Sequence, residues 1–265
     1  MGARVVTITS GKGGVGKTTA TANLSVALAM RGQRVVSIDA DIGLRNLDVV
    51  LGLENRIVYD LVDVVEGRCR LRQAMVRDKR LSELYLLPAA QTRDKNSVEP
   101  EQMVQICQEL RPDFDFILVD SPAGIEQGFR NAIAPADEAI IVTTPEVSAV
   151  RDADRIIGLI EAAEKESMKL LVNRLRPDMV RREDMLSIDD VLDVLAIDLL
   201  GVIPEDEQII VSTNRGHPLV LDGRNRAGQA YNNVASRMLG EDVPIMSFER
   251  ESLVNRVKRL FKIER

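Results

Sequence analysis

The feature that most constrains this chain is a glycine-rich loop between an apolar run and a helix-forming run. The eight residues from Gly11 to Thr18 read GKGGVGKT and match the pattern GxxxxGK[ST] in full. They follow the apolar run from Arg4 to Thr9, and they lead into residues 18–30, where apolar side chains recur at spacings of three and four. A strand, a glycine loop and a helix in this order predict a phosphate-binding loop in a parallel α/β sheet.

The residue types of this loop suit a nucleotide. Its glycines let the backbone curl so that successive N–H groups converge on phosphate oxygens, and the helix N-terminus adds partial positive charge. Lys17 would reach the β- and γ-phosphate oxygens, and the Thr18 hydroxyl would bind Mg²⁺. We therefore expect ATP with Mg²⁺ to be held by Gly11, Lys12, Gly13, Gly14, Val15, Gly16, Lys17, Thr18 and Thr19.

The rest of the chain alternates short Val-, Ile- and Leu-rich runs with longer segments of helical period. This pattern predicts the α/β fold of a P-loop NTPase, with a mostly parallel central sheet and helices on both faces. The expected strands are 4–9, 34–39, 84–87, 116–120, 139–143, 169–172 and 199–203. The expected helices are 18–30, 100–110, 149–163, 226–239 and a shorter one, 187–195, capped by Ser187.

Composition excludes several other classes of protein. The chain is 45% apolar and 29% charged, and it has no run of 18 apolar residues, which disfavours disorder and a membrane-spanning helix. Cys69 and Cys107 form no CxxC, so an iron–sulfur carrier on the same fold is disfavoured. The N-terminus carries no signal-peptide pattern, and we expect a cytoplasmic protein.

Without a repeat or linker, we expect one ATPase domain over 1–243 and a C-terminal appendage over 244–265.

Carboxylates follow two of the predicted strands, at the sheet edge where nucleotides bind. Asp120 ends the run from Phe116 and precedes Ser-Pro-Ala-Gly, so we expect it to hold Mg²⁺ together with Thr18. Asp39 and Asp41 end the second strand, where an acid would orient or deprotonate the attacking water. We favour Asp41 for this catalytic role over Asp39.

Lys12 is a second lysine that the phosphate cradle of its own loop does not need. A cation placed there would serve a facing subunit and stabilise charge on the transferring phosphoryl group in trans. This predicts a homodimer with nucleotide between its subunits, and a catalytic set of Lys12, Lys17 and Asp41. The alternative is that Lys12 is an ordinary solvated lysine.

Residues 11–18 resemble the deviant Walker A motif of the SIMIBI ATPases, the family that includes ParA-type and MinD proteins. Segments 39–48, 88–95, 120–126 and 201–206 resemble its MinD members, so the resemblance covers nearly the whole chain. It implies an ATP hydrolase that is slow by itself and stimulated by a partner. Lys12 would reach across the dimer, Asp41 would lie in switch I, and residues 120–124 would form switch II.

The same resemblance extends to the base and to the biological role. It implies a preference for ATP over GTP through residues beside the adenine, namely Asn173, Arg174, Pro204, Glu205 and Asp206. It implies a spatial switch in septum or division-site placement, in which the ATP dimer binds membrane and recruits a MinC-like division inhibitor. A MinE-like topological factor would stimulate hydrolysis and release. The expected location is the inner face of the cell membrane, or the inner envelope of a plastid.

The C-terminal tail differs in charge from the rest of the chain. Residues 250–265 hold six basic and two acidic residues, a net charge of +4, against −10 for the preceding 249 residues. On a helix, Leu253, Val257, Leu260 and Phe261 share one face, and Lys258 and Lys262 share the opposite one. We expect these six residues to contact an anionic membrane. The alternative is a helix packed on the body.

One such tail would anchor weakly, whereas two tails of a dimer would bind as a linked pair. ATP would thereby control membrane attachment. The alternative function is a ParA-like plasmid-partitioning ATPase that binds nonspecific DNA. The net charge of −6 and the amphipathic tail disfavour it, and we expect no specific nucleic acid partner.

Overall fold

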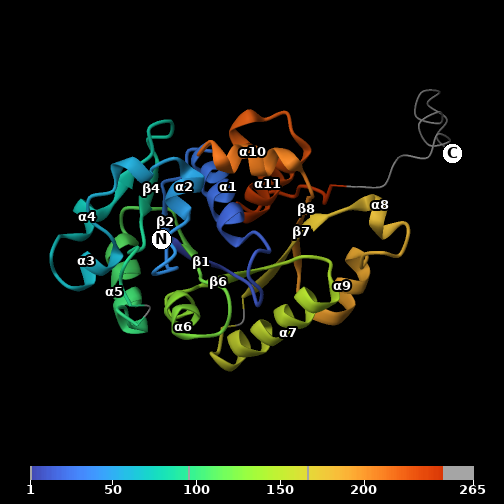
Figure 1. The fold of residues 1–265 in the computed structure, drawn as a ribbon, viewed down its shortest axis with the longest axis horizontal. Coiled ribbons are helices and arrows are strands. Elements are labelled where there is room, and N and C mark those ends of the chain that lie inside the picture. The colour runs from blue at the N-terminus through green and yellow to red at the C-terminus, as the bar shows by residue number, and fades with distance from the viewer. Residues whose placement is uncertain (1, 95, 166, 247–265) are drawn as a thin grey trace.

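The computed structural model describes residues 2–94, 96–165 and 167–246, and in this part of the chain eight strands form one sheet (Figure 1). Their order is β3-β4-β2-β5-β1-β6-β7-β8. The strands are β1 (Arg4–Thr9), β2 (Val35–Asp39), β3 (Val76–Arg77), β4 (Leu84–Leu87), β5 (Phe116–Asp120), β6 (Glu138–Thr143), β7 (Met168–Leu175) and β8 (Leu199–Pro204).

All neighbouring strands are parallel except β3, a two-residue edge strand that pairs antiparallel with β4. In the parallel part, Asp39 lies opposite Asp120, and Ile8 of β1 lies on the other side of Asp120. The carboxyl ends of β2, β5 and β1 therefore meet at one edge of the sheet. This edge is where a parallel α/β sheet binds its ligand.

Helices cover both faces of the sheet. They are α1 (Lys17–Ala29), α2 (Leu47–Leu51), α3 (Leu61–Val65), α4 (Leu71–Ala74), α5 (Pro100–Leu110), α6 (Gln127–Ile133), α7 (Val147–Ala162), α8 (Pro177–Val180), α9 (Ile188–Leu195), α10 (Glu207–Asn214) and α11 (Arg226–Met238). Two 3₁₀ turns, η1 (Glu54–Arg56) and η2 (Leu219–Asp222), complete the described elements.

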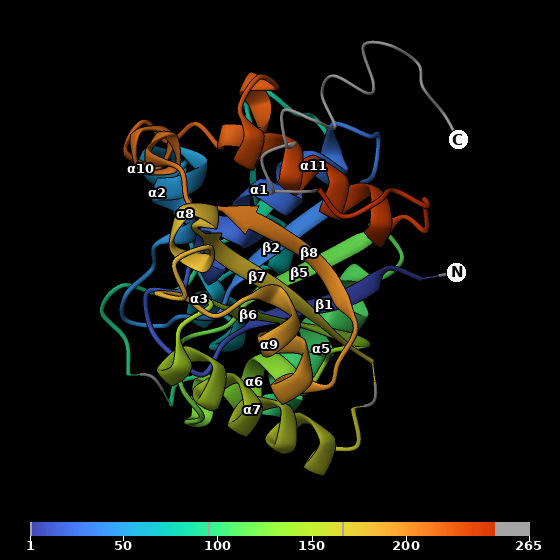
Figure 2. The ribbon, with the colours of Figure 1, turned by 90° about the vertical axis from the view of Figure 1, so that its right-hand side faces the viewer.

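The core divides by face. Helices α1, α2 and α11 pack on one face of the sheet, where α1 is buried almost all round and Tyr231 of α11 is fully buried. Helices α5, α6, α7 and α9 pack on the other face (Figure 2). The strands read as continuous apolar runs because both of their faces are buried. The predicted fold class is confirmed.

The predicted strands agree with the observed ones to within three residues. The largest difference is at β7, which was predicted over residues 169–172 and is observed over Met168–Leu175. All five predicted helices agree to within two residues, and Ser187 caps α9 by accepting a hydrogen bond from the Asp190 amide at 3.1 Å. The predicted 100–110 helix is observed unchanged. The short helices α2, α3, α4, α6, α8 and α10 and strand β3 were not predicted.

The start of the predicted C-terminal appendage is tied to the body. Arg237 donates hydrogen bonds to the backbone oxygens of Val243 (2.9 Å) and Pro244 (3.3 Å), and Met246 packs against the core. The tail residues Leu253, Val257, Lys258, Leu260, Phe261 and Lys262 lie outside the described residues, so their membrane role stays a prediction. Within the described ranges, no helix is both long and apolar enough to cross a membrane.

Candidate functional site

The predicted phosphate loop curls between β1 and α1. Gly14 and Gly16 adopt left-handed backbone angles, with φ of +77° and +99°. Gly16 is the N-cap of α1 and has no side chain with which to cap the helix. The first amides of α1 are therefore available to phosphate oxygens, as the loop pattern predicts.

Two neighbours hold this loop in place and require glycine at its contacts. A Cβ at Gly11 would lie 2.1 Å from the backbone oxygen of Asp152 in α7, and a Cβ at Gly16 would lie 2.3 Å from Asn173 Nδ2. Asn173 donates a hydrogen bond from this nitrogen to the Val15 carbonyl at 2.7 Å. The loop is thus fixed between α7 and the end of β7.

Lys17, Thr18 and Asp120 are brought together at the start of α1. Lys17 is 7% exposed and Asp120 is 1% exposed. Thr21 donates a hydrogen bond to Asp120 Oδ1 at 3.0 Å, and Thr18 also hydrogen-bonds to Asp120. A buried carboxylate beside a threonine hydroxyl matches the donor set that Mg²⁺ uses with nucleotide phosphates, so these residues fit the predicted ion.

Burial shifts the titration of both charged groups. It lowers the pKa of Lys17, against the opposing effect of the Asp120 and Asp41 carboxylates. It raises the pKa of Asp120 to about 6, against the Thr18 hydrogen bond and the Lys17 charge. Phosphate oxygens beside Lys17 and a divalent cation beside Asp120 would stabilise the charged form of each group.

The two acids after β2 have different surroundings. Asp39 is fully buried and accepts hydrogen bonds from the backbone amides of Asp41 (3.0 Å), Asn46 (3.2 Å) and Leu47 (3.1 Å). Burial and the Asp120 carboxylate raise the pKa of Asp39 to about 8. Asp39 therefore shapes the loop, while half-buried Asp41 lies close enough to Lys17 to interact with its charge. This arrangement agrees with the choice of Asp41 for the water, which stays a prediction.

Asp41 faces the segment predicted as switch II. A small cavity of about 60 Å³ lies between Asp41 and Ile42 on one side and Pro122 and Ala123 on the other. Ala123 also lies beside the phosphate loop, where a Cβ at Gly13 would be 3.8 Å from the Ala123 Cβ. The two predicted switches therefore flank the phosphate loop.

Lys12 does not fold onto its own phosphate loop. Its Nζ lies 3.0 Å from Ser148 Oγ and 3.3 Å from Glu146 Oε2, at the start of α7. Both partners are exposed, and the pair is screened by solvent. The ammonium group is therefore held at the surface of the protein.

The five residues predicted beside the base lie at the carboxyl ends of β7 and β8 and directly after β8, which the sheet brings together. Glu205 donates its backbone N–H to the Leu175 carbonyl at 2.9 Å, and Arg174 Nε lies 3.8 Å from Glu205 Oε2. Asp206 caps α10 through the Gln208 amide (2.9 Å) and accepts from Asn225 Nδ2 (2.7 Å). Pro204 ends β8 beside Leu175. The Asp206 carboxylate thus positions the loop through α10 and α11.

Three contributions were not anticipated from the sequence. They are the Asn173 hydrogen bond to Val15, the Thr21 hydrogen bond to Asp120, and the capture of three amides by Asp39. Thr21 follows Lys17 by one helical turn, so it faces the same way, and this spacing is a signal that could have identified it. The Asn173 contact joins segments 158 positions apart, and the Asp39 contacts depend on how the chain folds back within eight residues after β2.

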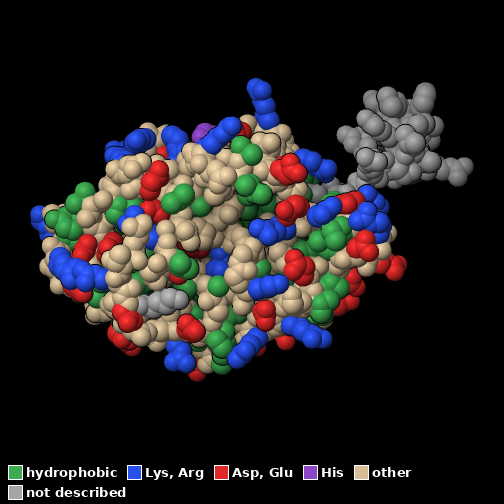
Figure 3. Space-filling view, in the orientation of Figure 1, with side chains coloured by type: hydrophobic (Ala, Val, Ile, Leu, Met, Phe, Trp, Pro, Cys, Tyr) green, Lys and Arg blue, Asp and Glu red, His purple; other side chains and the backbone are tan. Residues whose placement is uncertain are grey.

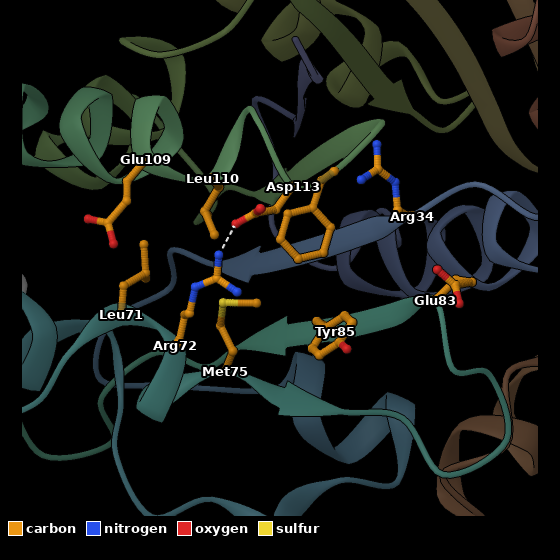
Figure 4. Close-up of a pocket in the computed structure, with 10 residues that line it drawn as sticks. Arg34, Leu71, Arg72, Met75, Glu83, Tyr85, Glu109, Leu110 and Asp113 are labelled. Carbon is orange, nitrogen blue, oxygen red and sulfur yellow. Dashed lines mark hydrogen bonds and ion pairs between the residues drawn. The ribbon is translucent and has the colours of Figure 1, made fainter.

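A larger hollow of about 440 Å³ lies away from this site (Figure 4). Leu71 and Met75 line it beside α4, and Leu110 and Phe114 line it at and after the end of α5. Arg72 reaches across it to Asp113 at 2.5 Å. None of the predicted nucleotide residues lines this hollow, so it is separate from the phosphate loop.

Known proteins share this fold and much of this sequence. A family model described as the CobQ/CobB/MinD/ParA nucleotide binding domain matches residues 6–219. The septum site-determining protein MinD of Bacillus subtilis is 55% identical over 267 residues, which cover 99% of each chain. MinD in the MinC:MinD cell division protein complex of Aquifex aeolicus superposes with a TM-score of 0.87 at 51% identity, covering 92% of this chain and 99% of that one.

Two further solved structures bear on the nucleotide and on the alternative function. The septum site-determining protein MinD of Pyrococcus horikoshii, complexed with Mg-ADP, has a TM-score of 0.82 at 32% identity and covers 91% of this chain and all of that one. A ParA family ATPase of Chlorobium tepidum is 26% identical, with a TM-score of 0.76, and covers 88% of this chain and 98% of that one. The ParA-like alternative is thus only a distant relation.

Proposed function

The chain belongs to the MinD family of septum site-determining proteins, and from this premise we propose that it acts as an ATP-controlled dimer on a membrane surface. It is a P-loop ATPase of division-site placement that uses ATP and Mg²⁺. The proposal adds how the bound nucleotide controls whether the protein is attached to the membrane.

The observation that carries the proposal is the direction of the Lys12 side chain. The phosphate loop already has Lys17 buried beside Asp120, whereas Lys12 Nζ lies at the surface near Glu146 and Ser148. A cation at this position supports catalysis only when a second nucleotide is brought to it. We infer that two chains face each other across their phosphate loops and that Lys12 stabilises the γ-phosphoryl group of the partner's ATP.

Hydrolysis is assigned to residues already close together. Lys17 binds the β- and γ-phosphate oxygens, Thr18 and Asp120 hold the cation, and Asp41 orients the attacking water. Mg²⁺, when bound with ATP, neutralises charge that develops on the phosphates. A lone protomer lacks the second Lys12, so it hydrolyses ATP slowly. Asn173, Arg174 and residues 204–206 flank the adenine.

A solved relative supports one of the proposed partners. The Aquifex protein is in complex with MinC, and we propose that the ATP dimer of this chain recruits a division inhibitor of the same kind. A topological factor of the MinE kind would order the switches around Asp41 and stimulate hydrolysis. The site of action is the inner face of the cell membrane, or the inner envelope of a plastid.

Membrane attachment is assigned to the basic, amphipathic residues 250–265. Each cation near an anionic lipid surface contributes about 1 kcal/mol, and the cost of ordering the helix offsets part of this. Two tails joined in one dimer bind as a linked pair, which raises affinity by about 10² to 10⁴ without a new contact. Dimer formation on ATP therefore attaches the protein, and hydrolysis releases it.

Vesicle co-sedimentation tests this proposal. The full chain should sediment with anionic vesicles in a non-hydrolysable ATP analogue and far less in ADP. A chain that ends at Glu249 should stay in the supernatant with both nucleotides. Equal binding of the full chain in ADP and in the ATP analogue would contradict the switch. Salt-dependent retention on DNA without lipid binding would favour the ParA-like function.

A further inference from the structure

A groove of about 760 Å³ lies beside the candidate site, at the carboxyl ends of β7 and β8. It is bordered by the start of α7, by α8 and by the loop that leads to α9. We propose that the chain's own C-terminal tail, residues 250–265, docks in this groove when the protein is a monomer. This proposal rests on the proposed function. A docked tail cannot bind membrane until ATP brings two chains together.

The groove has an apolar floor that is only partly covered. Val147 of α7 is 56% exposed. Four further apolar side chains are half-buried, and they are Met179, Val180, Met185 and Leu186. The apolar face of the tail, with Leu253, Val257, Leu260 and Phe261, would cover such a floor. Methionines suit the contact because their flexible side chains adapt to the surface that they meet.

The charges of the groove complement those of the tail. Five carboxylates and two arginines line it, so its net charge is −3, while residues 250–265 carry +4. The carboxylates are Glu146, Glu183, Asp184, Asp190 and Glu205. At the right-hand end of the molecule in Figure 3, over α8 and α9, acidic and basic side chains both lie next to hydrophobic ones. A basic amphipathic helix therefore matches the groove by charge as well as by its apolar face.

The chain leaves the body close enough to reach the groove. Arg237 links Val243 to the carbonyl of Leu200, near the start of edge strand β8, by bonds of 2.9 and 2.6 Å. Glu205, which follows the end of the same strand, borders the groove. β8 is six residues long, or about 20 Å. Nineteen residues follow Met246. Three extended residues and a 16-residue helix over 250–265 together span about 34 Å, so reach does not limit docking.

Docking in this groove would be incompatible with the ATP dimer. The groove contains Glu146, which holds Lys12 at 3.3 Å, and the ion pair of Arg174 and Glu205 beside the predicted base. A tail that covers these residues occupies the face where a second chain would place its nucleotide. ATP-driven pairing would displace both tails and free them for lipid in one step.

Photocrosslinking tests docking without reference to membrane or hydrolysis. Full-length chain with benzoylphenylalanine at position 261 is irradiated in ADP and in a non-hydrolysable ATP analogue, and crosslinked peptides are mapped by mass spectrometry. We expect links within one chain to residues 179–186 in ADP, reduced about tenfold in the analogue. The same probe at Asn255, on the polar face, should link to these residues far less.

The result that would overturn docking is equally direct. Links from position 261 that fall elsewhere on the body, that join two isotopically distinguished chains, or that persist unchanged in the ATP analogue exclude this occupant or its release. Because no lipid is present, docking is decided even if the full chain fails to bind vesicles. That failure would refute the membrane proposal alone.

A matched pair of variants tests the charge contribution. Glu183 and Asp184 are exposed and lie outside the predicted nucleotide site. E183Q/D184N should free the tail, lower the crosslink yield in ADP, and raise vesicle binding in ADP by about tenfold if the docked form is about 90% populated. E161Q/E164Q removes the same charge at an exposed site beyond the groove and should change neither. Equal effects of the two pairs would refute charge-guided docking.

Discussion

Replacing Gly16 with alanine tests how the phosphate loop is held. Gly16 has a φ of +99°, and alanine in this left-handed conformation costs about 1–2 kcal/mol. The new Cβ would also lie 2.3 Å from Asn173 Nδ2, so the Asn173 side chain must move. Its hydrogen bond to the Val15 carbonyl is buried, and losing it costs about 1–3 kcal/mol. G16A should therefore lower the free energy of unfolding by about 2–5 kcal/mol.

Two further variants separate these contributions. Gly32 follows the other end of α1 with a φ of +79°, and a Cβ there would meet no heavy atom of the described residues within 4 Å. G32A should therefore cost only about 1–2 kcal/mol. In the N173A background the obstructing amide is absent, so G16A should then cost only as much as G32A. The coupling free energy between Gly16 and Asn173 is then about 1–3 kcal/mol.

Urea denaturation measures these differences, provided that the m-value stays constant across the variants. Titration with a fluorescent ATP analogue should show weaker binding for G16A and unchanged binding for G32A. If G16A and G32A shift the unfolding midpoint equally, or if G16A and N173A are additive, then the Asn173 contact does not hold the loop.

The remaining predictions concern the two lysines and one ion pair. K17A should abolish nucleotide binding in the same titration. K12A should keep nucleotide binding by the monomer but lose dimers and turnover, and normal dimers by light scattering with ATP would contradict the trans role. Arg80 binds the carbonyl of Leu51 (2.6 Å) and pairs with buried Asp78 (2.7 Å), so R80A should cost about 2–4 kcal/mol at pH 7. Burial alone would raise the pKa of Asp78, but Arg80 brings it below 3.8. This stabilisation is therefore present above pH 3.8 and is lost as the pH falls through the lowered pKa, and urea titrations across that range check it.

Short segments of the sequence were enough to predict the local features of this protein. The phosphate loop from Gly11 to Thr18 could be placed because glycine conformations and a following helix are local properties. Strands such as Phe116–Asp120 could be placed because strands buried on both faces are continuous apolar runs. Helix α2 has only five residues, too few to show a period, and the apolar residues of α10 are adjacent at 209–211, whereas those of the equally short α9 recur at helical spacing.

Which distant groups come into contact depends on how the whole chain packs. Asn173 reaches Val15 across 158 positions of sequence, and Thr21 reaches Asp120 across 99. The direction of Lys12 toward Glu146 likewise depends on how α7 packs beside the loop. These contacts arise because strand order brings β1, β5, β6 and β7 together, and strand order follows from the packing of the whole core rather than from any local pattern.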